Sequence, residues 1–141
     1  MNVKKLYQDY LKEVKLMQLA TVEGDKPWLC NVWYVMDDDG NIYWASRRTR
    51  KHSEDIENNA NVACTFHKWF DRGLMIDKGQ AVVMSGRAIR LEGEECRKPY
   101  ELYAAHHPNL FEFRSLESFV SGEGDHSFYK ITPEKLSLIH I

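Results

Sequence analysis

The chain has 141 residues, 43% of them hydrophobic and 12% aromatic, which is typical of one globular domain, residues 1–141, with a single core. Its formal net charge of −2 argues against general nucleic-acid affinity, which requires a broad basic face. The three cysteines form no C-x-x-C pair and no 18-residue apolar run occurs, so we expect reduced thiols in a cytoplasmic protein that makes no membrane contact.

The first quarter of the chain predicts a helix followed by a β-hairpin. Apolar residues recur at helical spacing over residues 2–16, and residues 15–22 change to a strand-like pattern before the turn signal at 23–27. The next run, 28–36, is apolar or aromatic apart from Asn31. It predicts either a central strand covered on both faces or a strand that lines a cofactor cavity.

An acidic turn, residues 37–41, separates this run from the next strand. Its sequence, D-D-D-G-N, lacks the glutamate that ends a calcium loop, so a hairpin turn is favoured over a metal site.

A strand over residues 42–46 then leads into a concentrated basic turn. Residues 47–52, RRTRKH, hold four Arg or Lys side chains and one histidine. A short helix over 53–59 and a strand over 61–66 follow. A helix N-terminus offers unpaired N–H groups and a partial positive charge, so this combination predicts a site for a phosphate monoester. The alternative is a solvated basic turn.

The second half of the chain alternates strands with short helices. Gly86, inside a predicted strand over 80–91, indicates a bulge or a close approach of two backbones. Pro99 belongs in the first turn, or at a kink, of a helix within 92–107. The other predicted segments are a hairpin loop at 67–73, a strand at 74–77, helical pieces at 108–113 and 115–120, a loop at 121–125, and closing strands at 126–131 and 135–141.

Six or seven antiparallel strands with inserted helices predict a mainly β protein. Strands that close on themselves avoid exposed edges, so we expect a small β-barrel with peripheral helices. Cys30 and Cys64 lie in strand-like runs and are expected to be buried as small hydrophobic residues.

The stretch from Leu19 to Phe66, the later strand V-V-M-S-G-R-A and the ending F-Y-K-I-T-P-E-K-L-S-L-I resemble the pyridoxamine 5′-phosphate oxidase-like family. The resemblance spans nearly the whole chain. It implies an antiparallel split β-barrel of Greek-key type, FMN as cofactor, and a homodimer with flavin sites in the clefts between protomers. It also implies an oxidoreductase that acts on a small molecule.

The resemblance places the family's Y-T pair, which touches flavin and phosphate, on Ala45 and Ser46. It places the R-K pair, which holds the phosphate, on Lys51 and His52. The cofactor-facing first strand falls on residues 30–35, where the family oxidase begins with Arg and ends with Lys, and this sequence has cysteine and valine instead.

Two residues of that first strand, Asn31 and Val32, complete the flavin wall. Asn31 meets either the flavin edge or a neighbouring backbone group, because buried amides need partners.

On the phosphate side, the Ser46 hydroxyl and the Lys51 ammonium would donate to the phosphate, and Arg50 or Arg47 would add a bidentate fork. His52 would donate a ring N–H, with a raised pKa. The alternatives are a strand-end serine and an exposed helix histidine.

No catalytic side chain is expected, because no cysteine stands beside a basic partner and the flavin itself would carry the redox chemistry. A non-catalytic flavin-binding or redox-sensing module is the alternative function, and haem or deazaflavin the alternative ligand. The aromatic surface for a dimer interface would come from four tryptophans, Trp28, Trp33, Trp44 and Trp69.

Overall fold

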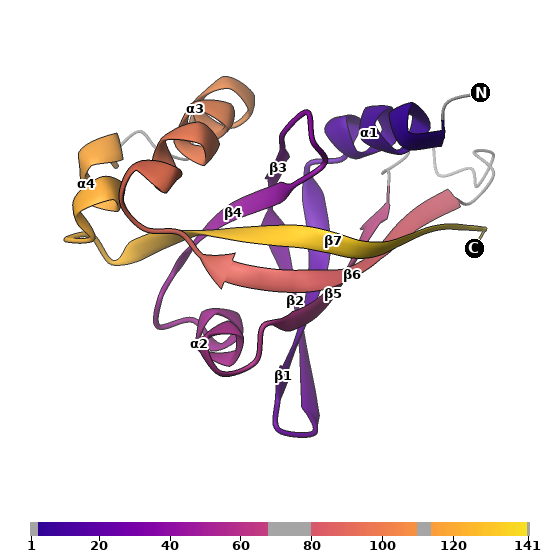
Figure 1. The fold of residues 1–141 in the computed structure, drawn as a ribbon, viewed down its shortest axis with the longest axis horizontal. Helices are drawn as coiled ribbons and strands as arrows, with labels where there is room; N and C mark the ends of the chain where they lie inside the picture. Colours follow the sequence, from indigo (N-terminus) through magenta and orange to yellow (C-terminus); the bar gives the residue numbers. More distant parts are fainter. Residues whose placement is uncertain (1–2, 68–79, 110–113, 141) are drawn as a thin grey trace.

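The computed structural model describes residues 3–67, 80–109 and 114–140, and the remaining residues lie outside the description. Seven antiparallel strands form one curled sheet, a half-barrel, with the helices around its rim (Figure 1). In chain order the elements are α1 (Val3–Glu13), β1 (Leu16–Glu23), β2 (Lys26–Trp33), β3 (Val35–Met36), β4 (Ile42–Arg47), α2 (Lys51–Asn58), β5 (Asn61–His67), β6 (Gln80–Arg90), a 3₁₀ turn (Gly93–Cys96), α3 (Arg97–His106), α4 (Leu116–Ser121) and β7 (His126–His140).

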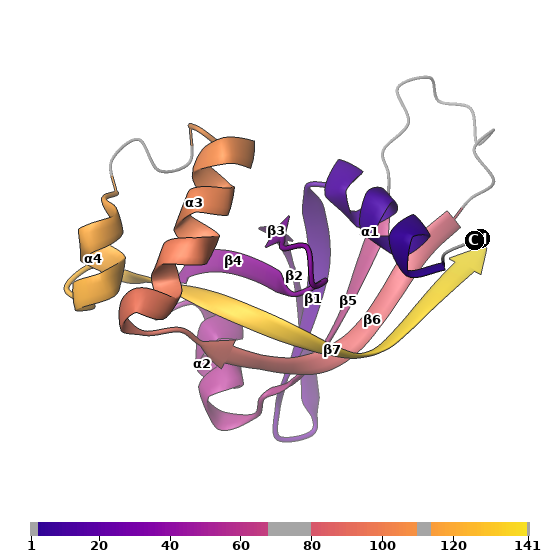
Figure 2. The ribbon, with the colours of Figure 1, turned by 45° about the horizontal axis from the view of Figure 1, so that its top comes forward.

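The two edges of the sheet are consecutive in the chain. The strand order is β2-β1-β5-β6-β7-β4-β3, so β2 and β3 lie at opposite edges although only Tyr34 separates them. The sheet therefore curls until its edges meet at Tyr34, and from there β2 and β4 diverge (Figure 2). We call the gap between these two strands the seam. The predicted antiparallel split β-barrel is confirmed.

Large side chains from the strands fill the inside of the curl. Trp44 and Phe66 are fully buried there, and Trp44 stacks on Tyr129 with ring centroids 5.4 Å apart. Phe128, on the other face of the sheet, packs against Tyr103 of α3 and Phe119 of α4. Helices α3 and α4 lie side by side at one end of the sheet, and α1 lies near the opposite end, beside the two termini (Figure 1). Among the described residues, no helix is long and apolar enough to cross a membrane.

The closing segment differs from its prediction, because β7 is one strand of 15 residues and not two strands. Pro133 has no N–H to donate, and it sits opposite Gly86 at a shift in the β6–β7 register. A Cβ built on Gly86 would lie 2.4 Å from the Thr132 carbonyl oxygen. Both the bulge and the close backbone approach expected at Gly86 are present.

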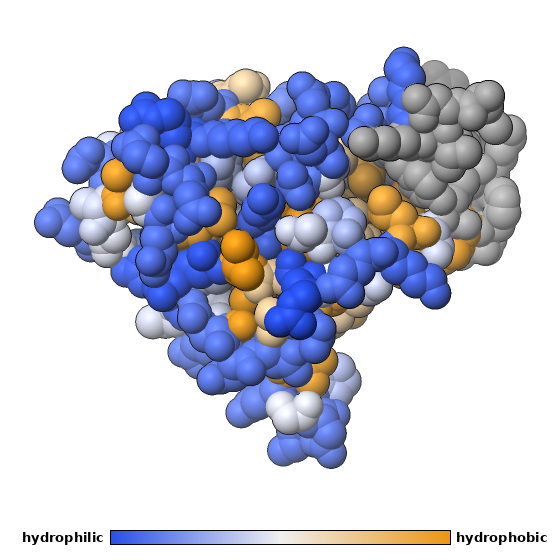
Figure 3. Space-filling model, viewed as in Figure 1, coloured by the Kyte–Doolittle hydropathy of each residue, from blue (hydrophilic) through white to orange (hydrophobic). Residues whose placement is uncertain are grey.

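The apolar run at 28–36 is not a covered central strand. Its first part belongs to β2, an edge strand on which Trp28, Leu29 and Trp33 are 44%, 64% and 49% exposed. Figure 3 shows a largely hydrophilic face with separated hydrophobic patches, one of them over the hairpin of β1 and β2. Of the other two tryptophans expected at an interface, Trp44 is in the core, and Trp69 lies outside the described residues, as do 68–73, 74–77 and 110–113.

The acidic turn is held by hydrogen bonds to one buried carboxylate. Asp37 accepts from the backbone N–H groups of Asp39 and Asn41, both at 2.9 Å, and from the Tyr43 hydroxyl at 2.9 Å. Lys98 of α3 adds an ion pair at 3.1 Å. Burial raises the pKa of Asp37, but the hydrogen bonds from Asn41, Lys98 and Tyr43 outweigh it and lower this pKa to about 2.

Candidate functional site

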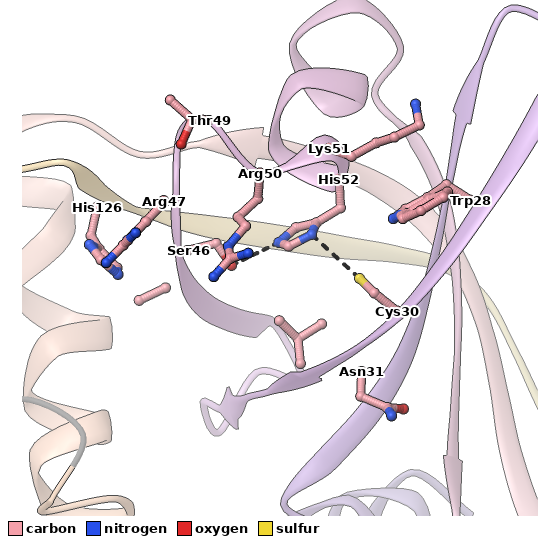
Figure 4. Close-up of a pocket in the computed structure, with 12 residues that line it drawn as sticks. Trp28, Cys30, Asn31, Ser46, Arg47, Thr49, Arg50, Lys51, His52 and His126 are labelled. Carbon is pink, nitrogen blue, oxygen red and sulfur yellow. Dashed lines mark hydrogen bonds between the residues drawn. The ribbon is translucent and has the colours of Figure 1, made fainter.

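An open cavity of about 680 Å³ lies at the seam, between β2, β4 and the N-terminus of α2 (Figure 4). All seven residues predicted to hold the cofactor line it, namely Asn31, Val32, Ala45, Ser46, Arg50, Lys51 and His52. The structure thus brings together residues from two strands and a helix. Whether they bind a cofactor is still a prediction.

Helix α2 begins two residues earlier than the sequence predicts, at Lys51 instead of Ser53. Arg50 is in the N-cap position and makes no side-chain cap hydrogen bond. The first-turn N–H groups of a helix have no partner within the helix. Since Ser46, the last but one residue of β4, lines the same cavity, a hydroxyl and a helix N-terminus converge there.

The cations of the basic turn have different partners. Arg48 holds the turn against β7, because its guanidinium donates to the His126 carbonyl at 3.2 Å and to the Ser127 hydroxyl at 3.0 Å. Arg47 lies 3.5 Å from a carboxylate oxygen of Asp125. These two arginines therefore have structural partners.

Lys51 is also engaged, which changes the role predicted for it. Its Nζ lies 2.7 Å from a Glu23 oxygen and 2.9 Å from an Asp55 oxygen, and these hydrogen bonds raise its pKa. Asp55 is buried and accepts a further hydrogen bond from the Thr21 hydroxyl at 2.8 Å. The ammonium thus joins α2 to β1 and extends toward Trp28, with Nζ 5.7 Å from the ring centroid.

Arg50 is the cation that the structure leaves available. No hydrogen bond or ion pair is recorded for its guanidinium within the described part of the chain, and Figure 4 shows it extending into the cavity beside Ser46 and His52. A guanidinium presents a planar fork of donors that fits a phosphate.

His52 lies at the centre of a chain of hydrogen bonds. Its Nε2 is 2.9 Å from the Ser46 hydroxyl oxygen, and its Nδ1 is 3.4 Å from the Cys30 sulfur (Figure 4). Burial lowers the pKa of His52, and the nearby positive charge of Arg50 lowers it further, against an opposing effect of Asp55. The pKa of His52 therefore lies below its usual value, and the imidazole is neutral at pH 7. The rise expected beside a bound phosphate stays a prediction.

The wall opposite the helix carries less polar side chains, including Val32, Ala45 and Trp28. Asn31 is exposed, and its Oδ1 accepts from the Gln18 side chain at 2.9 Å, so the expectation of a buried amide bonded to backbone is wrong.

The phenol of Tyr103 on α3 spans the seam beside this wall. It donates to the Trp33 carbonyl and accepts from the Ala45 N–H at 3.3 Å. It therefore links β2 to β4 across the gap between them.

Sequence reasoning missed several residues that line the cavity, Trp28, Thr49 and His126 among them, and it gave Cys30, in the cofactor-facing stretch, no role. Cys64 is buried as expected, but Cys30 is only half-buried and does stand beside a basic partner. No sequence signal could have revealed this pair, because its members are 22 positions apart on a strand and a helix.

Comparison with known proteins gives consistent results. The profile of the pyridoxamine 5′-phosphate oxidase family matches residues 3–140. The chain is 31% identical over 104 residues to the UPF0306 protein PM1958 of Pasteurella multocida. The matched region covers 70% of this chain and 67% of that protein. Among solved structures, Atu2129 of Agrobacterium tumefaciens, a protein of unknown function, superposes with a TM-score of 0.81 at 19% identity. That match covers 99% of this chain and 57% of Atu2129, so the chain spans little more than half of that protein.

Other proteins of the same fold bind different ligands. An FAD-binding protein of Mesorhizobium loti superposes with a TM-score of 0.67 at 20% identity, covering 93% of this chain and 89% of its own. The haem storage protein HutZ of Vibrio cholerae superposes with a TM-score of 0.70 at 17% identity, covering 99% and 95%. At these identities the comparison establishes the fold alone.

Proposed function

The chain belongs to the pyridoxamine 5′-phosphate oxidase family, and from that membership we propose that its cavity binds FMN and that the protein is an oxidoreductase acting on a small molecule. The observation that carries the proposal is the meeting, at one cavity, of a hydroxyl, a helix N-terminus and a guanidinium that has no partner among the described residues. These are the donors that recognise a phosphate monoester.

The residues present fit the cofactor. Arg50, Ser46 and the first-turn N–H groups of α2 would hold the phosphate, and His52 would orient the Ser46 hydroxyl through their 2.9 Å hydrogen bond. Val32 and Ala45 would contact the ring system, since cofactor sites are mostly apolar with a few polar groups.

Asn31 at the cavity rim would meet the ring edge, and Lys51 would contribute through its position in the helix more than through its paired ammonium. Bound FMN would supply hydride or electron transfer, so the protein's part is to bind the flavin, to orient it and to exclude water.

Haem is the alternative ligand, and the contacts of His52 do not favour it as an axial ligand. Axial ligation needs an imidazole nitrogen directed at the iron, whereas both nitrogens of His52 lie within hydrogen-bond distance of Cys30 and Ser46. A flavin phosphate, by contrast, can use the donors already at the cavity.

We further propose a homodimer in which the edge strand β2 is covered by a second copy. Trp28, Leu29 and Trp33 are apolar and exposed on an edge strand, which is a site prone to association. A partner there would lie beside the open side of the cavity, since Trp28 belongs to both.

The test is a titration of the purified protein with FMN and with riboflavin, followed by absorbance and fluorescence. FMN should bind more tightly than riboflavin, because only FMN carries the phosphate. Equal affinities, or a haem spectrum in the purified protein, would contradict the proposed site. Reduction of the bound flavin by NADH or NADPH then separates an enzyme from a non-catalytic flavin module, which would leave the flavin oxidised.

A further inference from the structure

The cavity contains a thiol beside a base. The Cys30 sulfur lies 3.4 Å from His52 Nδ1, and the opposite ring nitrogen lies 2.9 Å from the Ser46 oxygen. All three side chains line the cavity, and Cys30 is half-buried on β2. The flavin proposal above gives the thiol no role.

We propose that Cys30 is a covalent modification site, at which small α,β-unsaturated carbonyl compounds that enter the cavity are captured as thioethers with His52 as the base. This proposal does not depend on flavin binding. It uses only the position of the thiol, the base and the opening of the cavity.

The hydrogen bonds define how the proton can move. When Nε2 carries the ring hydrogen and donates it to the Ser46 oxygen, the lone pair of Nδ1 faces the Cys30 thiol. The low pKa of His52 keeps the ring neutral, so this lone pair is available at pH 7. Burial raises the pKa of Cys30, so the thiol is protonated at rest and needs a base to react.

The step balances without an oxidant. His52 Nδ1 takes the thiol proton while the sulfur attacks the β-carbon of the unsaturated carbonyl compound. A carbon–sulfur bond forms, the carbon–carbon π bond breaks, and its electron pair moves to the α-carbon. The proton held by His52 then returns to that carbon, directly or through water, and the imidazole is neutral again.

The surroundings set the pH range of this chemistry. The charged or titratable groups around the pair are Arg50, Lys51 and Asp55 of α2 and its turn, Arg47 of β4, His126 of β7 and Glu23 of β1, which pairs with Lys51. Lys51 is neutralised by its two carboxylates, which leaves Arg50 as the charge that most opposes protonation of His52. The base should therefore remain active below the usual pKa of a histidine.

The experiment is labelling of the full chain with N-ethylmaleimide, an α,β-unsaturated carbonyl probe, followed by peptide mapping by mass spectrometry. Cys64 and Cys96 are internal controls, because they are 2% and 1% exposed. We expect one adduct, on Cys30, and none on the two buried thiols. Replacing the base, His52→Gln, should slow the labelling of Cys30 at pH 7 on the order of tenfold, and this difference should vanish at high pH, where the thiol ionises without help.

The rate of the unmodified protein against pH provides a second measurement that requires no variant. Assistance by His52 predicts a plateau of reactivity around neutral pH, below the ionisation of the thiol itself. A single rise at the pKa of the thiol, equal rates in the protein and in His52→Gln, or absence of an adduct on Cys30 would each overturn the proposal. Labelling of Cys64 or Cys96 in the variant would show that it had unfolded, and the pH profile alone would then decide.

Discussion

Replacing Arg50 by alanine should reduce the affinity for FMN much more than the same change at its neighbour Lys51. The two cations are adjacent in sequence, but the structure gives them different positions. The Arg50 guanidinium extends into the cavity, whereas the Lys51 ammonium lies within 2.9 Å of two carboxylates. The pair is therefore a matched test of which cation binds the phosphate.

The expected magnitude follows from the contact that is lost. A hydrogen bond to a charged group contributes about 2 kcal/mol, so Arg50→Ala should raise the dissociation constant for FMN about thirtyfold. Lys51→Ala should change it by less than about threefold, because the ammonium already has partners. Riboflavin lacks the phosphate, and its affinity should change little in either variant. Quenching of flavin fluorescence in a direct titration measures all four values.

Two results would refute this reasoning. If Lys51→Ala weakened FMN binding more than Arg50→Ala, the phosphate would lie on the β1 side of the helix end. If Arg50→Ala weakened riboflavin as much as FMN, the guanidinium would act on the cavity as a whole. The variant Arg50→Lys, which keeps the charge but loses the planar fork, should be intermediate.

Three further predictions concern the fold and assembly. Gly86→Ala should lower the free energy of unfolding by about 2 kcal/mol or more in urea denaturation, because its Cβ would meet the Thr132 carbonyl oxygen. Gly124→Ala is the control: its Cβ would have contacts of 3.4 Å or longer, so the free energy of unfolding should fall much less. The pKa of Asp37 is about 2 in the fold and near its usual value in the unfolded chain, so about 2 kcal/mol of stability should be complete above about pH 4 and disappear as the pH falls toward 2. A shallower loss over this range in Asp37→Asn would confirm the assignment, and an unchanged slope would refute it. Leu29→Lys places a charge on the most exposed apolar residue of β2. It should shift the protein from dimer to monomer, which light scattering would show as a lower mass. An unchanged mass would exclude β2 as the interface.

Local patterns predicted most strands well, because alternation and turn residues act over a few positions. Ile42–Arg47 and Asn61–His67 differ from their predicted ends by one residue each. Of the two alternatives for the run at 28–36, the covered central strand is wrong, because Trp28, Leu29 and Trp33 are exposed on an edge strand, whereas the first part of the run does line a cavity. We propose that a second copy of the chain covers these exposed residues, and a single sequence gives no direct sign of such a partner.

The cavity was predicted from a short sequence segment, but its chemistry depends on contacts between distant residues. Nothing near Lys51 in the sequence indicates that Glu23 of β1 would pair with it. In the same way, the Cys30–His52 contact exists only because the sheet curls and brings β2 beside α2. The sequence thus indicated which residues line the cavity, and the curvature of the sheet determines which of them are paired with residues distant in the sequence.

The hydrogen bonds of Tyr103 have a consequence for the separation of β2 and β4. The two strands that flank the chamber come from distant places in the strand order, so no ladder of backbone hydrogen bonds sets their separation. The Tyr103 phenol of α3 bridges them, and His52 of α2 forms a second bridge through Cys30 and Ser46. A displacement of α3 would therefore change the separation of β2 and β4 while the sheet register stays as it is.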